Sequence, residues 1–276
     1  MQILGISINN LTRKQILQKL EFILSEKNKK FYQIATVNPE FILQAQKDEE
    51  FKNILNSEIT LNIADGIGLK FAAWRQGKNL KYRFAGADLL QEVLKIAEKN
   101  DQKVLVITHK NSLSSESKVK IALEKLYPSL ENKVIVMQRS NLCECKGWTF
   151  AELKEVFTNY RLRITDYDIV LCNLGVPHQE KLLYQLRNIK GRDLSSAELS
   201  EAKANEEVES LPNLKLAIGI GGSLDFLNGK IKRAPKWMRV IGLEWLYRLI
   251  LEPRYRLKRI YNAIIVFPIK VIFKKI

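Results

Sequence analysis

The sequence predicts an α/β protein built on a mostly parallel sheet, because short β-branched runs alternate with helical periodicity along most of the chain. The chain has 276 residues, of which 46% are hydrophobic and 27% are charged. This length and apolar content can bury a large core, and they exclude a disordered or collagen-like chain. One principal domain with room for an appendage is therefore expected.

Six short apolar segments, each rich in β-branched residues and bounded by turn residues, are predicted as the strands of this sheet. In chain order they cover residues 31–37, 59–63, 103–108, 133–137, 168–173 and 215–218. Amphipathic helical segments lie between them. One covers residues 39–55, where Pro39 suits the first turn of a helix, and another covers residues 87–99, where leucines recur at helical spacing.

Two regions depart from this alternation. Residues 191–213 carry acidic side chains among Ser and Ala with little apolar content, which predicts a solvated, mobile excursion. From Lys230 to the end, Lys and Arg are interleaved with Trp, Tyr and Phe. We therefore expect a core over residues 1–229, which includes the acidic excursion, and a basic C-terminal appendage over residues 230–276.

The chain has a formal net charge of +15, from 45 Lys and Arg against 30 Asp and Glu. This excess favours an anionic partner: a nucleic acid, a phosphorylated substrate or a membrane surface. Apolar residues recur at helical spacing in the appendage, a pattern typical of an amphipathic helix in a membrane interface. The alternative is an ordinary core helix with solvated basic residues. Pro268 and Lys270 interrupt the most apolar stretch, so no bilayer-spanning helix is expected.

The cysteines and histidines indicate which cellular compartment and which kinds of site to expect. The cysteines are Cys143, Cys145 and Cys172, and one residue separates the first two. This odd number and this spacing favour a reducing cytoplasmic compartment over a disulfide framework or a zinc pair. The first residues do not have the pattern of an export signal. Because the only histidines are His109 and His178, we expect no metal site.

Polar residues follow the first two predicted strands. Thr36 and Asn38 alternate at the end of one strand, so their side chains point to the same face, and Asp65 follows the next strand. Open α/β sheets bind ligands at this edge, outside the carboxyl ends of the strands. We therefore predict Asp65 as a general base. Helix capping is the alternative role for Asn38 and for Asp65.

A phosphate site is predicted at the start of the helix that follows the strand over residues 168–173. Gln179 and Glu180 fall in the first turn of that helix, where free backbone amides favour an anion. The alternative for Glu180 is a surface residue that compensates the helix dipole.

A glycine-rich loop covers residues 219–225 and contains Gly221 and Asp225. Leu224 stands where the third glycine of a dinucleotide fingerprint belongs, which disfavours a dehydrogenase. The loop is either a compact turn that passes near a nucleotide or a purely structural turn.

Five segments together resemble the WecG/TagA/CpsF glycosyltransferases, family 26. They are residues 36–38, 64–68, 83–88, 174–180 and the long block 221–253. The resemblance implies a Rossmann-like sheet and an inverting, metal-independent transferase that needs no cofactor. It implies transfer of a sugar, N-acetylmannosamine in the best-known members, from a UDP donor to a polyprenyl-diphosphate-linked sugar. It also implies that the appendage meets the anionic cytoplasmic face of the membrane.

Carried over residue by residue, the resemblance gives Asp65 the role of general base. It gives Thr36, Asn38, Arg83 and Gln179 as residues that line the active site. We also expect the glycine loop and the arginines of the appendage to bind substrate, because guanidinium groups suit phosphate geometry. The residues concerned are Gly221, Asp225, Arg248, Arg254 and Arg256, with Arg259 as a further candidate.

The chain departs from the family pattern in two places. His178 stands where the family commonly has Lys or Arg, and residues 191–213 form a longer excursion than expected. A different class of function is also open, a non-catalytic nucleic-acid-binding module that uses the basic aromatic appendage. No recognition-helix, RRM or zinc-finger pattern accompanies the appendage, so we expect no nucleic-acid partner.

Overall fold

The computed structural model describes residues 1–28, 30–109, 115–139, 166–187, 213–227, 229 and 231–273. Within these residues the fold is an α/β sandwich around a six-stranded sheet of order β4-β3-β8-β7-β5-β6, in which every neighbouring pair is parallel. The predicted fold class is confirmed, and so is each of the six predicted strands. The strands are β3 (Tyr32–Val37), β4 (Thr60–Ala64), β5 (Val104–His109), β6 (Val134–Arg139), β7 (Ile169–Asn173) and β8 (Leu216–Gly219).

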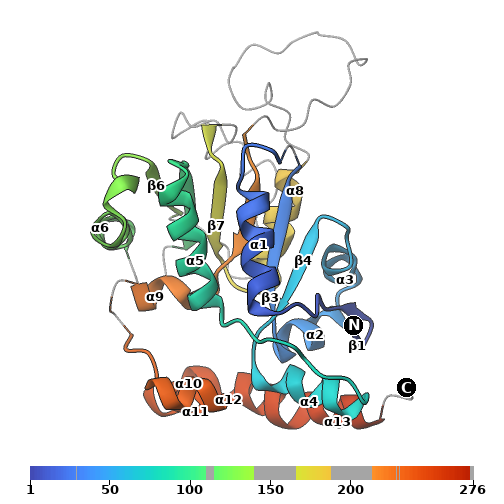
Figure 1. Ribbon diagram of the computed structural model, residues 1–276. Coiled ribbons are helices and arrows are strands. Elements are labelled where there is room, and N and C mark those ends of the chain that lie inside the picture. Colours follow the sequence, from blue (N-terminus) through green and yellow to red (C-terminus); the bar gives the residue numbers. More distant parts are fainter. Residues whose placement is uncertain are drawn as a thin grey trace, which may run out of the picture.

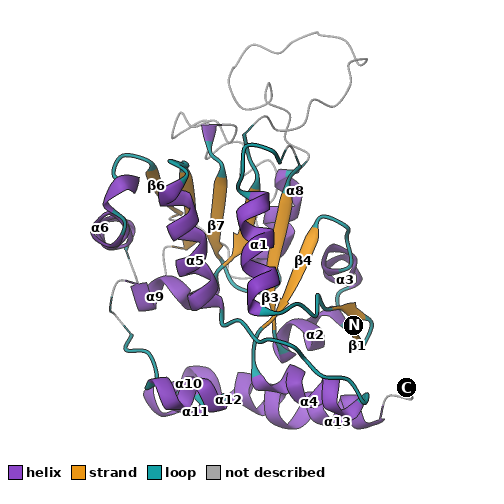
Figure 2. Cartoon of the chain, in the orientation of Figure 1, coloured by secondary structure: helices purple, strands orange, loops and turns teal. Residues whose placement is uncertain are grey.

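Helices cover both faces of the sheet, as Figures 1 and 2 show. Strand residues alternate between the two faces because side chains along a strand point to opposite sides. Ile34 and Val106 pack in one apolar cluster with residues of α1 (Arg13–Ile23), α5 (Gly86–Lys99) and α6 (Glu116–Leu126). The opposite face packs against α8 (His178–Leu186), α2 (Pro39–Ala45), α3 (Glu49–Leu55) and α4 (Ile67–Arg75).

The segment predicted as helical over residues 39–55 is two helices, α2 (Pro39–Ala45) and α3 (Glu49–Leu55). The break has a local cause. Asp48 is the N-cap of α3, and its side chain accepts a hydrogen bond from the backbone N–H of Phe51 at 3.0 Å. The chain therefore leaves the first helix before Asp48 and starts a new one after it.

Three elements near the N-terminus were not predicted, namely two short strands and a helix. The strands β1 (Gln2–Ile3) and β2 (Ile6–Ser7) form a short antiparallel pair beside the main sheet. Helix α1 begins at a capping box, in which Thr12 and Gln15 satisfy each other's backbone amides. That spacing is visible in the sequence and is the signal that identifies this helix.

The C-terminal residues form a series of short helices beneath the carboxyl ends of the strands, in one layer with α4 (Figure 1). Gly242 ends the first of them in a left-handed conformation, with φ of 84°. The elements of this series are α10 (Lys236–Ile241), α11 (Glu244–Leu251), α12 (Pro253–Tyr261), the π-helical turn η4 (Asn262–Val266) and α13 (Phe267–Phe273). Two short elements, η3 (Gly221–Ser223) and α9 (Leu224–Leu227), come before this series in the chain.

The appendage is packed on the core. Phe267 and Val271 of α13 are buried in the same apolar cluster as residues of α2 and α4. Two polar contacts also hold the appendage against the core. Nη2 of Arg83 donates to the backbone oxygen of Arg239 at 2.6 Å. Arg233 forms an ion pair with Asp88 at the start of α5. One side of α13 thus behaves as a core helix.

The other side of α13 is apolar and exposed, as expected for an amphipathic helix in a membrane interface. Ile269, Ile272 and Phe273 are 48%, 45% and 80% exposed. Across the described ranges of the chain, no helix is both long enough and apolar enough to span a bilayer. The acidic excursion, apart from its last residue, and the pair Cys143 and Cys145 lie outside the described residues.

Candidate active site

A cavity of about 1040 Å³ lies between the carboxyl ends of the strands and the appendage. This is the edge at which open α/β sheets bind ligands. All of the predicted site residues line this cavity except Arg254, which is exposed on α12 and lies outside it. Those that meet there are Thr36, Asn38, Asp65, Arg83, Gln179, Gly221, Asp225, Arg248 and Arg256, together with Arg259.

Asp65 stands directly after β4, where its backbone N–H donates to the carbonyl oxygen of Val37 at 2.7 Å. Its carboxylate Oδ2 accepts a hydrogen bond of 3.4 Å from the backbone N–H of Gly86, the first residue of α5. It does not cap its own helix, because the N-cap of α4 is Gly66, without a side-chain cap. The side chain is therefore turned toward the cavity.

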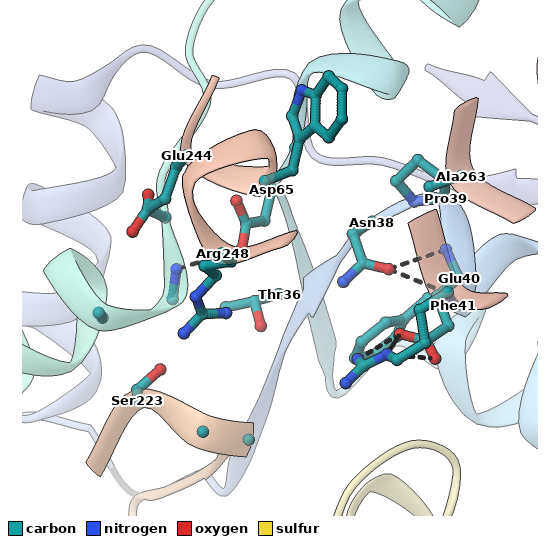
Figure 3. A pocket seen from close by; sticks show the side chains of 18 of the residues that line it. Thr36, Asn38, Pro39, Glu40, Phe41, Asp65, Ser223, Glu244, Arg248 and Ala263 are labelled. Carbon is teal, nitrogen blue, oxygen red and sulfur yellow. Dashed lines mark hydrogen bonds and ion pairs between the residues drawn. The ribbon is translucent and has the colours of Figure 1, made fainter. Parts of the chain in front are cut away.

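Enclosure by the protein raises the pKa of Asp65 above its ordinary value. The positive charge of Arg83 opposes this shift, and the carboxylate of Glu244 adds to it. Figure 3 shows Asp65 and Glu244 on the same side of the cavity, with Arg248 beside them. A carboxylate of raised basicity, set beside cations, is suited to accept a proton from a bound hydroxyl group.

Asn38 caps α2, as the alternative interpretation expected. Its Oδ1 accepts from the backbone N–H groups of Glu40 and Phe41, at 2.9 and 3.2 Å. Asn38 therefore both caps α2 and lines the cavity (Figure 3). Thr36 is 8% exposed and lies against the start of α5, where a Cβ atom on Gly86 would stand 3.5 Å from its Oγ1.

Gln179 connects the start of α8 to the glycine-rich loop. Its Nε2 donates to Oε1 of Glu180 at 2.6 Å, and its Oε1 accepts from the backbone N–H of Gly221 at 3.3 Å. Gly219 leaves the room for this arrangement, because a Cβ atom there would stand 2.5 Å from Oε1 of Glu180. The glycine-rich loop is therefore both a structural turn and part of the cavity wall.

The interpretation of Glu180 as a surface residue is wrong. The side chain is fully buried, because the first turn of α8 faces the sheet, where Nε2 of Gln33 donates to the backbone oxygen of Glu180 at 3.0 Å. Burial raises the pKa of Glu180 to about 8. Its Oε2 has no hydrogen-bond partner among the described residues.

Arginines of the appendage close the cavity opposite the sheet. The guanidinium carbon of Arg248 lies 4.3 Å from the ring centroid of Phe226, and burial lowers the pKa of Arg248 to about 10, which leaves it charged at neutral pH. Arg256 is held by Glu252, with Nε and Oε2 at 2.7 Å. Nε of Arg259 donates to both carboxylate oxygens of Glu40, at 3.0 and 3.1 Å.

Among the further residues that line the cavity but were not singled out from the sequence are Ser223, Arg233 and Glu244. All three lie in the block over residues 221–253 that carries the family resemblance, which was the available signal. His178 opens α8 but does not line the cavity. Over the ranges that the structure describes, no three His, Cys, Asp or Glu side chains come together as a metal site.

Comparison with known proteins shows the family of this chain. The family model described as "Glycosyl transferase WecG/TagA/CpsF family" matches residues 1–192 and 196–276. A Bacillus subtilis (strain 168) protein named N-acetylglucosaminyldiphosphoundecaprenol N-acetyl-beta-D-mannosaminyltransferase is 29% identical over 83% of this chain and 75% of its own length. The Staphylococcus aureus (strain MRSA252) protein of the same name is 26% identical over 91% of this chain and 84% of its own.

These matches are to glycosyltransferases, and they give no support to the alternative of a nucleic-acid-binding module. The family model spans nearly the whole sequence, including the strand ends that carry Asp65 and the appendage that carries Arg248. The chain belongs to the WecG/TagA/CpsF family of glycosyltransferases.

Proposed function

We propose that this protein transfers an N-acetylhexosamine, with N-acetylmannosamine as the leading candidate, from a UDP donor to a polyprenyl-diphosphate-linked sugar. The observation that carries this proposal is the Asp65 carboxylate at the carboxyl end of β4, in a cavity that also holds Arg83, Arg248, Arg256 and Arg259. The names of the relatives supply the candidate acceptor, N-acetylglucosamine on diphosphoundecaprenol. The product would enter a cell-surface polysaccharide.

Asp65 acts as the general base in a single displacement. It takes the proton from the acceptor hydroxyl as that oxygen forms a bond to the anomeric carbon of the donor sugar. The bond from this carbon to the UDP oxygen breaks at the same time, and the anomeric configuration inverts. A base with a raised pKa is better matched to this task than an ordinary aspartate.

The departing UDP carries developing negative charge, which the protein must stabilise. Arg248 and Arg256 are suited to this role, since a guanidinium group can donate two parallel hydrogen bonds to phosphate oxygens. The glycine-rich loop around Gly221, held by Gln179, forms part of the cavity wall at the same edge of the sheet. Thr36, Asn38 and Asp225 complete the wall against which the sugar and nucleotide are placed.

We assign the enzyme to the cytoplasmic face of the membrane as a peripheral protein, with residues 230–276 as the contacting appendage. The exposed apolar residues of α10 to α13 support this, because they stand among basic side chains that an anionic lipid surface attracts. An acceptor with a polyprenyl chain also requires that the enzyme work at a bilayer.

The test is transfer from a panel of UDP-sugars, including UDP-N-acetylmannosamine, UDP-N-acetylglucosamine and UDP-glucose, to a synthetic lipid-diphosphate-N-acetylglucosamine. A chelator is present throughout, and Asp65→Asn is the control. Chelator-resistant transfer that the variant loses would support the proposal and identify the donor. Absence of transfer from every donor to this acceptor would count against it.

A further inference from the structure

The cavity has two chemically different ends. Around Asp65 and Arg248 the wall is polar and charged. On the side opposite Asp65 and Glu244, Figure 3 shows Pro39 and Ala263 together, next to Asn38 and Glu40, and apolar side chains line the cavity there as well. The apolar wall comes from α4 on one side and from α12, η4 and α13 on the other. Its members are Ile67, Phe71, Ile260, Ala263, Ile264 and Pro268, which we call the lipid groove.

We propose that the lipid groove binds the first isoprene units of the acceptor, next to its diphosphate. This inference rests on the proposed function for the nature of the acceptor, and it adds a subsite for the hydrocarbon chain. The order of groups in such an acceptor is sugar, diphosphate and isoprenoid. The cavity offers groups of matching chemistry: a base, cations and an apolar wall.

The cations and the apolar wall are adjacent along one helix. Arg256 and Arg259 line the cavity and lie about one turn and one residue before Ile260 on α12. A diphosphate held by these guanidinium groups therefore has its attached alkyl chain within reach of Ile260 and of Ala263, which follows on η4. A π-helical turn at this point is also consistent with a binding role, because such turns occur frequently at functional sites.

The groove is not sealed by the rest of the protein. Ile67 and Ile264, which stand on its two sides, are each 39% exposed. Exposure of paired aliphatic side chains to water is unfavourable, and their burial by hydrocarbon would be favourable. The occupant that the groove selects is therefore apolar.

The apolar surface continues outward from the groove. Ile265 and Ile269 on the appendage are 43% and 48% exposed, and Trp74 on α4 is 71% exposed. Helices α4 and α13 pack side by side, so these residues and the groove belong to one layer of the molecule (Figure 1). A chain that leaves the groove on this side would pass directly into the bilayer that the proposed function requires. This continuity favours an isoprenoid over a peptide segment as occupant.

The experiment measures binding rather than turnover, in detergent-free solution without membranes. Isothermal titration calorimetry compares geranyl diphosphate with methyl diphosphate, which share a head group and differ in the apolar chain. We expect geranyl diphosphate to bind at least tenfold more tightly, a difference of about 1.4 kcal/mol. Because no bilayer is present, partition of the protein onto a membrane cannot produce this preference.

Two variants on opposite walls test the location. Ile67→Ser and Ile264→Ser are each expected to reduce the preference for geranyl diphosphate to threefold or less, while the affinity for methyl diphosphate stays within twofold of the wild-type value. Ile272→Ser is the matched control, since Ile272 is 45% exposed on α13 and does not line the cavity. It should retain the full preference, and unchanged melting temperatures would show that all three variants are folded.

Equal affinities of the wild type for the two diphosphates would overturn the inference. So would an equal loss of preference in Ile272→Ser, which would indicate non-specific adherence to exposed apolar surface. If Ile264→Ser dissociated a dimer seen by sedimentation and left the geranyl preference unchanged, a second copy of the chain would be the occupant instead. A retained geranyl preference without any sugar transfer would refute the proposed function alone, so the two failures are distinguishable.

Discussion

Gln179 and Glu180 are neighbours in the sequence whose side chains also hydrogen-bond to each other beneath the cavity, with Nε2 of Gln179 donating to Oε1 of Glu180 at 2.6 Å. Glu180 is fully buried, whereas the amide of Gln179 reaches the backbone of Gly221 in the cavity wall. The buried carboxyl group therefore sets the orientation of a side chain that lines the cavity. We propose Glu180 as a positioning residue.

The buried carboxyl group makes the fold sensitive to alkaline pH. Its pKa is about 8 in the folded protein against an ordinary value of 4.5, so the folded state holds a proton that the unfolded state has released between these values. The free energy of unfolding therefore falls as pH rises through this window and levels off above pH 8. From pH 6 to pH 8 the loss is about 2 to 3 kcal/mol.

Glu180→Gln removes this titration and keeps the shape of the side chain. We expect the free energy of unfolding of the variant, relative to wild type, to increase by about 2 to 3 kcal/mol between pH 6 and pH 9, measured by urea denaturation. A difference between the two proteins that does not change with pH would contradict the prediction.

Gly219→Ala tests the packing beneath Gln179. The added Cβ would stand 2.5 Å from Oε1 of Glu180, so the pair must move, and we expect a loss of about 1 to 3 kcal/mol in the free energy of unfolding with reduced transfer. Gly222→Ala is the matched control for stability, because its new Cβ would meet Asp225 at an ordinary 3.5 Å. A similar loss of stability in both variants would argue against a specific clash.

The sequence was sufficient for the sheet and for much of the site, for physical reasons. The strands are short apolar runs, most of them rich in β-branched residues, which identifies them in the sequence. Ligands bind outside the carboxyl ends of parallel strands, and this rule was enough to predict that Thr36 and Asp65 lie in one site. Local capping chemistry was also readable at Asn38. Features that depend on contacts between near neighbours in the chain could therefore be predicted.

Features that depend on contacts between residues far apart in the chain could not be predicted from the sequence. The burial of Glu180 requires α8 to pack on Gln33, which lies 147 positions earlier in the chain. The place of Glu244 in the cavity depends on how the appendage docks, through contacts such as that of Arg83 with Arg239. Arg254 was predicted in the site because it belongs to a basic run, and a run of like residues does not reveal which side of a helix faces inward.

Asp65→Asn should abolish transfer without unfolding the protein. The amide cannot accept the hydroxyl proton, and removal of a general base costs a factor of about 10² to 10⁴ in rate. Burial disfavours the charged form of Asp65, so the neutral amide should leave the melting temperature unchanged or higher. Asp101→Asn, at an exposed site paired with Lys133, is the control for the substitution. Near-wild-type turnover in Asp65→Asn would show that Asp65 is not the general base.

Arg248→Lys separates guanidinium geometry from positive charge. Lysine retains a cation near Phe226 but loses the planar fork that can bind two phosphate oxygens, so we expect kcat/KM to fall by about 10-fold to 100-fold. Arg254→Lys carries the same chemical change on an exposed side chain outside the cavity and should remain close to wild type. Equal losses in the two variants would show that overall charge, not placement in the cavity, determines activity.

The exposed apolar residues of α13 should carry part of the attachment to membranes. In the double variant Ile269→Ser with Phe273→Ser, two side chains that are 48% and 80% exposed lose the hydrocarbon they would bury in a bilayer. Their removal should weaken binding to anionic vesicles by about tenfold in a co-sedimentation assay, with no loss of thermal stability. Ile121→Ser changes an equally apolar residue, 63% exposed on α6 away from the appendage, and should bind vesicles as the wild type does.

Salt dependence separates the two contributions to this attachment. Basic side chains of the appendage act through a field that 0.1 M salt screens within about 10 Å, whereas burial of Ile269 and Phe273 is insensitive to salt in this range. The tenfold effect of the double variant should therefore persist from low salt to 0.1 M, while overall binding weakens for both proteins. Unchanged vesicle binding in the double variant, or an equal loss in Ile121→Ser, would show that this side of α13 does not contact the lipid.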